Sequence, residues 1–383
     1  MYHRIILFLM MFVGLLVELK AQNFNSKQVE DLSYQNFLNG NHEQQIKLIE
    51  TVLPLGIDYY YLRVRLGIAY MAKGNYRTAL FHFNKAKKFN RHGVEAISYI
   101  RDCSLALGMD NLDRLSKKES GIPVGFLKMI YAETGMKQSS FADTIGHTYF
   151  AHYGMQFALG SKLTSYQAYS FAYQNTLPLN VRQHQYYTHL AYKPSVNWQI
   201  NGNFSYLIAN IQLNTNDSVY NEANYVYGFS IIKHHKKFDY SLNASYSYLN
   251  LKEQIQGGIA LSYFVFGNDL LQLRMQANAQ YQDSVLTPIY IPSATIKLFR
   301  NCWLKGEYII ANTSNFIEQD AFITNNNPDK TFDKATLMLN YKVKSRHDFY
   351  LLGQLENKEV DPIDKPAKPY QFKNIILGYS IKF

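Results

Sequence analysis

The sequence predicts a two-part fold, in which an all-helical region is followed by an antiparallel transmembrane β-barrel of about 14 strands, or about 12. Glycine signals recur every 34 residues near the N-terminus, a period typical of stacked helix pairs. After about residue 120, apolar and polar residues alternate strictly, which gives each strand one apolar and one polar face. The connections between these strands alternate between short and long, as they do in outer-membrane barrels.

The composition of the 383-residue chain excludes several classes of protein. Hydrophobic residues make up 47% and tyrosine occurs 32 times, which excludes disorder as the main state. Only two cysteines are present, so a disulfide scaffold is excluded. The mean hydropathy is −0.25, and no uncharged apolar run reaches the roughly 18 residues of a spanning helix. The formal charge of +10 contains no basic block, so we expect no nucleic-acid partner.

Residues 1–21 predict a secretory signal peptide. Arg4 supplies the positive region, and an apolar run follows from Ile5 to Val17. Ala21 provides a small residue at the cleavage site, so we expect cleavage before Gln22. The apolar run is too short for a membrane anchor. The mature chain is therefore expected to enter the bacterial envelope.

Residues 22–119 are predicted to form a helical domain. Gly40, Gly74 and Gly108 are spaced by 34 residues, and Leu32, Leu66 and Ile100 share this period. The clearest unit spans 60–93, with small residues where two helices must approach closely and large apolar residues between them. These positions are Leu66, Gly67, Tyr70, Gly74, Tyr76, Ala79, Phe83 and Ala86. They resemble the tetratricopeptide repeat.

The repeat resemblance implies a concave face that docks a periplasmic protein partner. That face would be lined by the first helix of each pair, with the residues Tyr34, Phe37, Tyr61, Val64, Ile68 and Met71. The alternative is that these side chains are buried against a neighbouring helix, because about three repeats make only a small groove.

Residues 120–383 are predicted to form the barrel. A soluble sheet with one wet face would also alternate, but three features favour the membrane. The strands are long, tyrosines end many of the apolar runs, and the connections alternate in length. The predicted strands are 123–135, 147–159, 163–175, 183–193, 196–209, 221–233, 238–250, 254–266, 270–282, 288–300, 303–313, 332–344, 347–359 and 371–383.

The connections predict the orientation of the barrel. Short turns follow the even-numbered strands, and longer links, including 136–146, 210–220, 314–331 and 360–370, follow the odd-numbered ones. Outer-membrane barrels have short periplasmic turns and long external loops. Both ends of the barrel domain and the helical domain are therefore expected in the periplasm, with the strands in the outer membrane of a Gram-negative envelope and in contact with its lipid.

The C-terminus ends on an alternating strand with a terminal aromatic residue. Gly378, Ile381 and Phe383 resemble the signal that the barrel-assembly machinery reads during biogenesis. Ile376 departs from that signal, because a polar residue is usual at its position. The resemblance implies that this machinery is a partner of the chain during insertion.

Seven charged residues are predicted by strand parity to face the lumen. They are Lys128, Arg274, Lys305, Glu307, Lys334, Lys342 and Glu356. Either these charges pair with each other in a solvated interior, or they form a mildly cationic pore lining that selects anions. A barrel of about 14 strands lies between barrels filled by side chains and open porins. The strand number is therefore consistent with a narrow or plugged pore as well as with an open one.

The sequence contains no recognisable catalytic or metal-binding motif. Cys103 and Cys302 lack metal-ligand spacing, and His234 and His235 lie in a predicted turn. Neither a phosphate-binding loop nor a serine-centred elbow is present. We therefore expect a protein that is not an enzyme and has no cofactor or bound metal. A hydrolase with its site on the barrel wall remains an alternative, because histidines occur near the early strands.

A signal peptide, tetratricopeptide-like repeats and a C-terminal barrel together resemble the YaiO family of outer-membrane proteins. The same domain order recurs in exopolysaccharide export porins and in Slam-type surface-lipoprotein translocators. The resemblance implies that the repeats dock an envelope partner and that the barrel supports export or assembly of surface polysaccharide or protein. The alternatives are a general pore or structural barrel without a dedicated cargo, and the barrel-wall hydrolase.

Overall fold

The computed structural model describes residues 25–107, 126–141, 145–176, 179–213, 218–318, 323–324, 329–344, 346–360 and 368–383. The predicted signal peptide, Gly108 and the boundary between residues 119 and 120 lie outside the described residues. None of the helices in these ranges has the length and apolar character needed to cross a membrane.

The N-terminal part of the described chain contains five α-helices and one short 3₁₀ turn. They are α2 (Ser26–Leu38), α3 (His42–Val52), η1 (Leu53–Leu55), α4 (Tyr60–Ala72), α5 (Tyr76–Phe89) and α6 (Val94–Ala106). Gly40 and Gly74 follow α2 and α4 with φ of 66° and 71°, a left-handed conformation that favours glycine. The 34-residue spacing therefore marks equivalent turns in two successive helix pairs.

Two apolar clusters hold the helices together. In one, Val29, Ile49 and Leu66 join α2, α3 and α4. In the other, the ring of Phe83 packs where Gly67 lacks a side chain, so that α4 and α5 approach closely. A Cβ atom at position 67 would overlap that ring. The small residue predicted at this contact is thus required by the packing.

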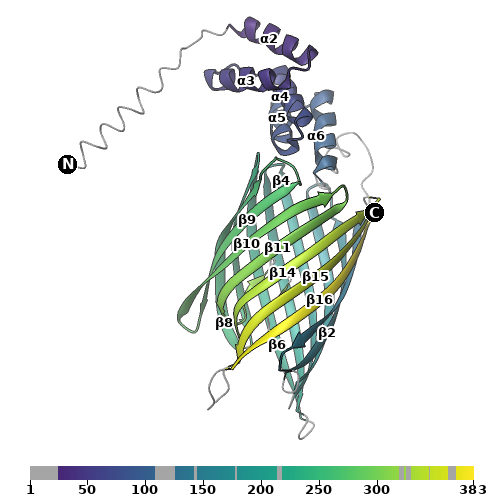
Figure 1. Ribbon diagram of the computed structural model, residues 1–383, viewed down its shortest axis with the longest axis vertical. Coiled ribbons are helices and arrows are strands. Elements are labelled where there is room, and N and C mark those ends of the chain that lie inside the picture. The colour runs from purple at the N-terminus through teal and green to yellow at the C-terminus, as the bar shows by residue number, and fades with distance from the viewer. Residues whose placement is uncertain are drawn as a thin grey trace, which may run out of the picture.

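Fourteen antiparallel strands form one closed barrel (Figure 1), so the prediction of 14 strands is confirmed and the alternative of 12 is wrong. The barrel strands are β1 (Leu127–Ser139), β2 (Ile145–Ala158), β3 (Leu163–Thr176), β4 (Leu179–Ser195), β5 (Trp198–Leu213), β6 (Val219–His235), β7 (Phe238–Leu249), β8 (Lys252–Phe264), β9 (Leu271–Gln282), β10 (Val285–Phe299), β11 (Cys302–Thr313), β14 (Lys330–Val343), β15 (His347–Val360) and β16 (Lys368–Lys382). The two-residue strands β12 (Ile317–Glu318) and β13 (Ile323–Thr324) pair only with each other.

The first strand lies four residues later than predicted, at 127–139 instead of 123–135. Its position is set by pairing with the last strand, in which Glu133 lies opposite Gly378 and Ser139 opposite Phe372. This pairing closes the barrel, and the alternation of residues within β1 alone does not determine it. Pro288 and Pro292 in β10 pair with β9 but are not matched to residues of β11, as expected for residues without an N–H group.

The two ends of the barrel differ. The short turns 196–197, 236–237 and 300–301 lie at the end of the barrel that carries the helices, which we call the helical end (Figure 1). The opposite end, called the far end, carries the link between β11 and β14, from residue 314 to residue 329. The far end also has two-residue turns, at 250–251 and 283–284. The prediction that every link after an odd-numbered strand is long is therefore wrong.

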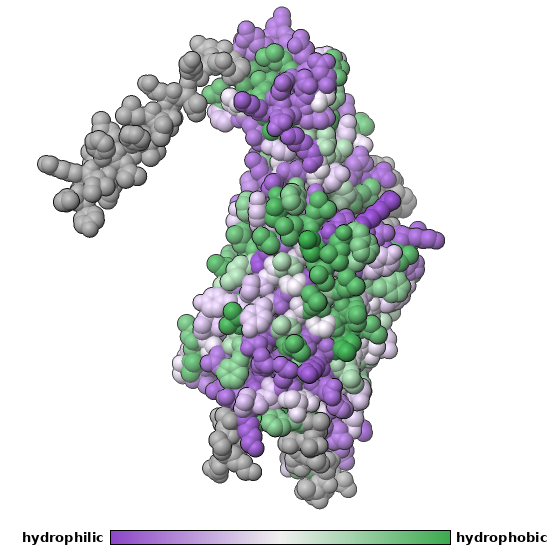
Figure 2. Space-filling model, viewed as in Figure 1, coloured by the Kyte–Doolittle hydropathy of each residue, from purple (hydrophilic) through white to green (hydrophobic). Residues whose placement is uncertain are grey.

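The two faces of the barrel wall differ in polarity. Leu242, Ile259 and Leu377 on the outer face are 57–61% exposed, whereas the alternate positions carry buried polar residues such as Asn201 and Gln256. Figure 2 shows a broad hydrophobic area on the visible barrel wall below the helices. Exposed tyrosines lie near both ends of the strands, with Tyr240 and Tyr341 towards the helical end and Tyr220 and Tyr281 towards the far end.

The helical region is anchored to the barrel by Arg77 at the start of α5. The Arg77 side chain forms an ion pair with Asp239 in β7 and donates from Nε to the backbone oxygen of Lys236 at 3.0 Å. Its guanidinium group lies 3.7 Å from the centre of the Phe264 ring. The backbone N–H of Arg77 donates to the oxygen of Gly267 at 2.9 Å. One residue thus joins α5 to two turns of the barrel.

Further contacts surround this anchor. The Asn268 side chain donates to the oxygen of Gly74 at 3.1 Å, and Phe81 of α5 meets His235 edge to face at 5.1 Å. Val196, in the turn between β4 and β5, packs against the apolar cluster of the helices. The helices therefore rest on three successive turns at the helical end.

Candidate functional site

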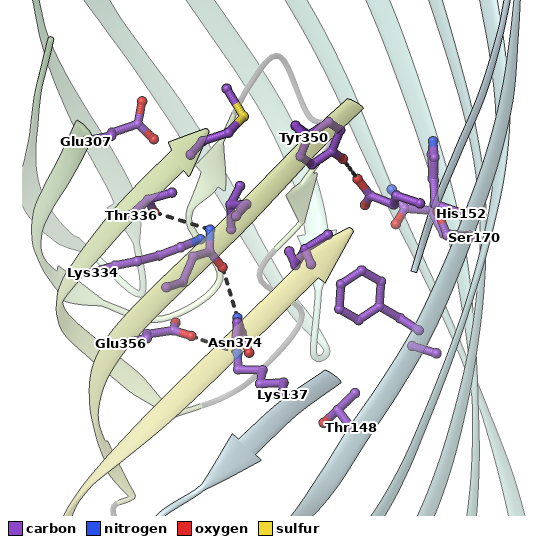
Figure 3. A pocket seen from close by; sticks show the side chains of 18 of the residues that line it. Lys137, Thr148, His152, Ser170, Glu307, Lys334, Thr336, Tyr350, Glu356 and Asn374 are labelled. Atoms are coloured by element: carbon purple, nitrogen blue, oxygen red, sulfur yellow. Dashed lines mark hydrogen bonds and ion pairs between the residues drawn. The ribbon is translucent and has the colours of Figure 1, made fainter. Parts of the chain in front are cut away.

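Two cavities of the lumen are lined by residues that the structure describes. The larger, of about 470 Å³, is lined by residues of β1 to β4 on one side and of β11 and β14 to β16 on the other. The smaller, of about 300 Å³, is lined by residues of β9, β10 and β11 together with Glu318. A volume of several hundred Å³ is the size of a small-molecule pocket. Figure 3 shows the larger cavity, with Tyr350 on β15, His152 on β2 and Lys334 close to Thr336.

Most charges in the lumen are paired. Lys305 lies 2.8 Å from Glu307, and Lys334 binds Glu318 at 2.9 Å. A third cluster places Lys137 at 2.7 Å and Lys358 at 3.3 Å from Glu356. These four lysines and three carboxylates leave little excess positive charge. The geometry therefore favours mutual pairing over a strongly anion-selective lining.

Six of the seven predicted lumen charges lie on the inner face. Arg274, Lys305, Glu307, Lys334 and Glu356 line the two cavities. Lys342 lies nearer the helical end, with its Nζ atom 4.8 Å from the centre of the Trp303 ring. The structure does not bring Lys128 into either cavity. It lies at the register shift between Leu127 and Met129 of β1, where simple alternation no longer assigns a face.

Residues 314–318, which we call the inner segment, fold into the lumen. Gln280 donates to the oxygen of Ser314 at 2.9 Å, and Gln254 donates to the oxygen of Asn315 at 2.5 Å. Gln256 holds Ile317 twice, donating to its oxygen at 2.9 Å and accepting from its N–H at 3.0 Å. Side chains of β8 and β9 thus form the hydrogen bonds with the backbone N–H and C=O groups of the inner segment that a neighbouring strand would otherwise form.

Apolar contacts hold the inner segment on two sides of the lumen. Phe316 is fully buried and packs against Ile289, Ile291 and Ile309 of β10 and β11. Ile317 belongs to a second cluster with Ala168, Tyr187, Leu207, Val226 and Leu249 from β3 to β7. Because these two clusters lie on different walls, the inner segment crosses the lumen near the far end.

From the sequence, residues 314–331 are predicted to form a long link, and the inner segment within it is not predicted. The signal available was the apolar pair Phe316 and Ile317 within a polar link. Glu318 was also missed, although it forms the ion pair of Lys334 and is 4% exposed. Its partner could not be found from local pattern, because the pairing depends on how the link folds.

An aromatic wall forms one side of the larger cavity and comprises Tyr131, Phe150, His152 and Tyr350, with Tyr166 packed against His152. Tyr131 and Tyr350 both donate their hydroxyl groups to Oε2 of Glu133. His152 contacts Ser170 Oγ through Nδ1 at 2.6 Å and the Tyr166 hydroxyl through Nε2 at 3.0 Å. Hydroxyl groups thus occupy both ring nitrogens of His152, whereas a serine hydrolase needs a carboxylate on the second nitrogen.

Three of the six residues of the predicted partner groove are exposed, and the other three pack inside the helical region. Tyr34, Phe37 and Tyr61 are exposed by 48%, 36% and 56%. Val64 is buried in the cluster that joins α4, α5 and α6, and Ile68 and Met71 pack against the same cluster. The chain's own helices therefore cover the second half of the predicted groove.

The residues of the predicted assembly signal lie on the closing strand. Phe383 is 61% exposed, and its N–H donates to the oxygen of Lys128 at 3.0 Å. Ile381 pairs with Ile130 of β1, where the last strand meets the first and closes the barrel. A Cβ atom at Gly378 would overlap the ring of Tyr350, so this glycine has a packing role in addition to any role in recognition.

Residues that could support metal or redox chemistry are dispersed. Cys103 lies in the helical core and Cys302 at the start of β11, and neither forms a disulfide. Within the described ranges, no group of three or more histidine, cysteine or acidic side chains is arranged to hold a metal ion. His234 instead contacts Asp239 at 2.8 Å, beside the Arg77 anchor.

No protein-family model and no curated protein matches the chain, so the resemblance to the YaiO family stays a prediction. Among solved structures, the chain is similar to the CymD monoaromatic hydrocarbon channel, with TM-score 0.47 and 9% identity over 73% of this chain and 93% of that one. It is also similar to a Pseudomonas aeruginosa FadL homologue, with TM-score 0.42 and 8% identity over 67% and 89% of the two chains. For an anion-selective porin from Comamonas acidovorans, the TM-score is 0.35 and the identity 11%, over 68% and 99%. These scores are too low to indicate what this chain binds or conducts.

Proposed function

We propose that this chain is an outer-membrane channel for small solutes, closed near its far end by the inner segment. The single observation that carries this proposal is the inner segment itself, which crosses a polar lumen and is held there by side chains of the wall. A barrel with a purely structural role would be stabilised equally well by apolar side chains filling its interior.

The membrane location is supported by the outer face. Leucine, isoleucine and phenylalanine side chains are exposed around the wall, and the strands of 12–17 residues are long enough to span a bilayer at a tilt. Tyrosines exposed near both strand ends match the aromatic girdles of membrane barrels. With the long link between β11 and β14 at the far end, that end would be external and the helices would lie in the periplasm.

Conduction can be tested with the full-length protein in planar lipid bilayers. In the variant Gln256→Ala, the inner segment loses two hydrogen bonds, at about 1 kcal/mol each. A destabilisation of about 2 kcal/mol corresponds to a roughly 30-fold larger open population. The matched control is Gln276→Ala, since Gln276 also faces the lumen but donates to Asn278. We expect infrequent current steps for the wild type and the control, and frequent steps for Gln256→Ala.

A second variant tests the same idea in case the inner segment finds new hydrogen-bond partners in Gln256→Ala. Phe316→Ala with Ile317→Ala removes both apolar contacts of the inner segment and should open the lumen further. If neither variant conducts more than the control while all proteins remain folded, the inner segment does not close a channel. A folded barrel migrates differently in electrophoresis before and after heating, which provides the folding check.

A second function is supported by the exposed aromatic residues of the helical region. We propose that Tyr34, Phe37 and Tyr61 dock an envelope protein, as the tetratricopeptide resemblance implies. Replacing all three by serine should abolish recovery of cross-linked envelope proteins with the tagged chain, and replacing the exposed Lys88 should not. Unchanged recovery with the triple variant would contradict docking through these residues. Export or assembly of a surface polymer would rest on such a partner.

A further inference from the structure

Glu133 differs from the other carboxylates that line the larger cavity. Glu307 and Glu356 each have a lysine within 3.5 Å. Glu133 accepts hydrogen bonds from the neutral hydroxyl groups of Tyr131 and Tyr350, and no lysine, arginine or histidine of the described residues lies within ion-pair distance of it. A carboxylate placed among aromatic rings without a cation is costly unless something compensates its charge.

The rings around Glu133 are seated over glycines. A Cβ atom at Gly378 would overlap the Tyr350 ring, and one at Gly154 would overlap the Tyr166 ring. Gly135 provides the same room for Phe150. The rings of Tyr131 and Tyr350 are nearly parallel, at 16°, with their centres 6.3 Å apart. Each ring lies over a glycine of the neighbouring strand, within the run β15, β16, β1, β2 and β3, so the rings form a fixed surface for which the wall itself leaves space.

The remainder of the cavity lining is suited to an uncharged, partly apolar body. Met338, Leu352 and Ile376 supply apolar surface, and Gln354 and Asn374 supply amides that already bond to each other at 2.9 Å. The lysines in this lining are engaged by Glu307, Glu318 and Glu356. Among the charged side chains that line the larger cavity, Glu133 is therefore the one whose charge a ligand could neutralise.

We propose that the larger cavity binds an organic ammonium ion, with the cationic group held against Glu133 and the rings of Tyr131 and Tyr350. A carboxylate combined with aromatic faces is the arrangement that recognises ammonium groups, because the ring quadrupole and the carboxylate both attract a cation. The apolar body of the ligand would lie against Met338 and Leu352. The cavity volume of about 470 Å³ accommodates a small ligand of this kind.

This site extends the proposed function by naming a class of solute for the lumen, but binding can be measured without conduction. Isothermal titration of the detergent-purified full-length protein with benzyltrimethylammonium provides the direct test. Benzyl alcohol and phenylacetate have the same ring without the positive charge. We expect saturable binding of benzyltrimethylammonium to be at least tenfold tighter than that of either comparison compound.

The variant Glu133→Gln keeps an oxygen that both tyrosines can donate to, and removes the charge. We expect it to weaken benzyltrimethylammonium binding at least tenfold. The matched control is Asp283→Asn, which removes one negative charge in an exposed turn at the far end, where Asp283 pairs with Lys252. Its affinity should equal that of the wild type.

Three results would overturn the proposal: no saturable binding of benzyltrimethylammonium, equally tight binding of benzyl alcohol, or unchanged affinity in Glu133→Gln. These results are separable from the test of conduction. A protein that binds the ammonium ion without conducting would refute the channel and retain the site. A protein that conducts and does not bind it would refute the site alone.

Discussion

Arg77 is the residue on which the attachment of the helical region to the barrel most depends. Its side chain is 6% exposed and contacts Lys236, Asp239 and Phe264 at once. The substitution Arg77→Met keeps much of the volume and removes the charge. Breaking a buried ion pair by removing one partner costs about 3–5 kcal/mol, because the other charge stays buried. His234 remains beside Asp239 at 2.8 Å, so we expect a loss of about 3 kcal/mol.

Hydrogen–deuterium exchange of the full-length protein measures this loss. The amide of residue 77 donates to Gly267 across the contact, so its exchange reports separation of the helices from the barrel. A loss of about 3 kcal/mol predicts exchange that is roughly 100-fold faster at this amide and in the segment 265–270. The matched control is Lys88→Met on the same helix, where the side chain is exposed.

The double variant Arg77→Met with Asp239→Asn tests the pair itself. Since each single change leaves the other group without its main partner, the double variant should lose about 1–3 kcal/mol less than the sum of the single losses. Additive losses would show that the ion pair contributes nothing beyond its separate parts. Equal exchange rates in Arg77→Met and Lys88→Met would refute the assignment of Arg77 as the anchor.

Two further predictions follow from the packing. Burial and the nearby Arg63, Lys236 and Lys85 lower the pKa of His82 to about 3, so the folded helices hold it neutral while the unfolded chain protonates near pH 6.5. The contribution of neutral His82 to stability is present above pH 6.5 and is lost as the pH falls towards 3, and the loss between pH 7 and pH 5 is about 2 kcal/mol. Unfolding of the helices, followed by circular dichroism, should show this dependence on pH in the wild type. The variant His82→Gln should show a weaker dependence. At the closing strand, Gly378→Val should destabilise the barrel by about 1–3 kcal/mol through overlap with the Tyr350 ring, whereas Gly353→Ala, which meets nothing within 4 Å, should leave the heating midpoint unchanged in electrophoresis.

The strands were largely predictable from the sequence because alternation is a local property. Strand β7 was predicted at 238–250 and spans Phe238–Leu249, and β11 was predicted at 303–313 and spans Cys302–Thr313. The face of each lumen charge follows from the same alternation, except at Lys128, where a register shift interrupts it. Strand β1 is shifted by four residues at both ends, because its ends are set by pairing with a strand more than 200 residues away, and β4 begins four residues earlier than predicted.

The contacts that define the candidate site were not predictable in the same way. Gln256 and Ile317 are 61 residues apart, and neither has a local pattern that points to the other. Arg77 looks like an ordinary helix residue until the turns of the barrel are placed beside it. For Val64 the sequence allowed either a place in the groove or burial against a neighbouring helix, because the repeat pattern does not specify how tightly α6 packs over α4. Each of these depends on the closed barrel or on the neighbouring helix.

Strand β8 connects two of these contacts mechanically. Near its beginning, Gln254 and Gln256 hold the inner segment, and at its end Phe264 lies beneath the guanidinium group of Arg77. The strand is a nearly inextensible link of hydrogen-bonded backbone from one end of the barrel to the other. A force applied to α5 is therefore transmitted through the Phe264 contact to the strand that also holds the inner segment at the far end. The attachment of the helices and the position of the inner segment thus share one strand of the wall.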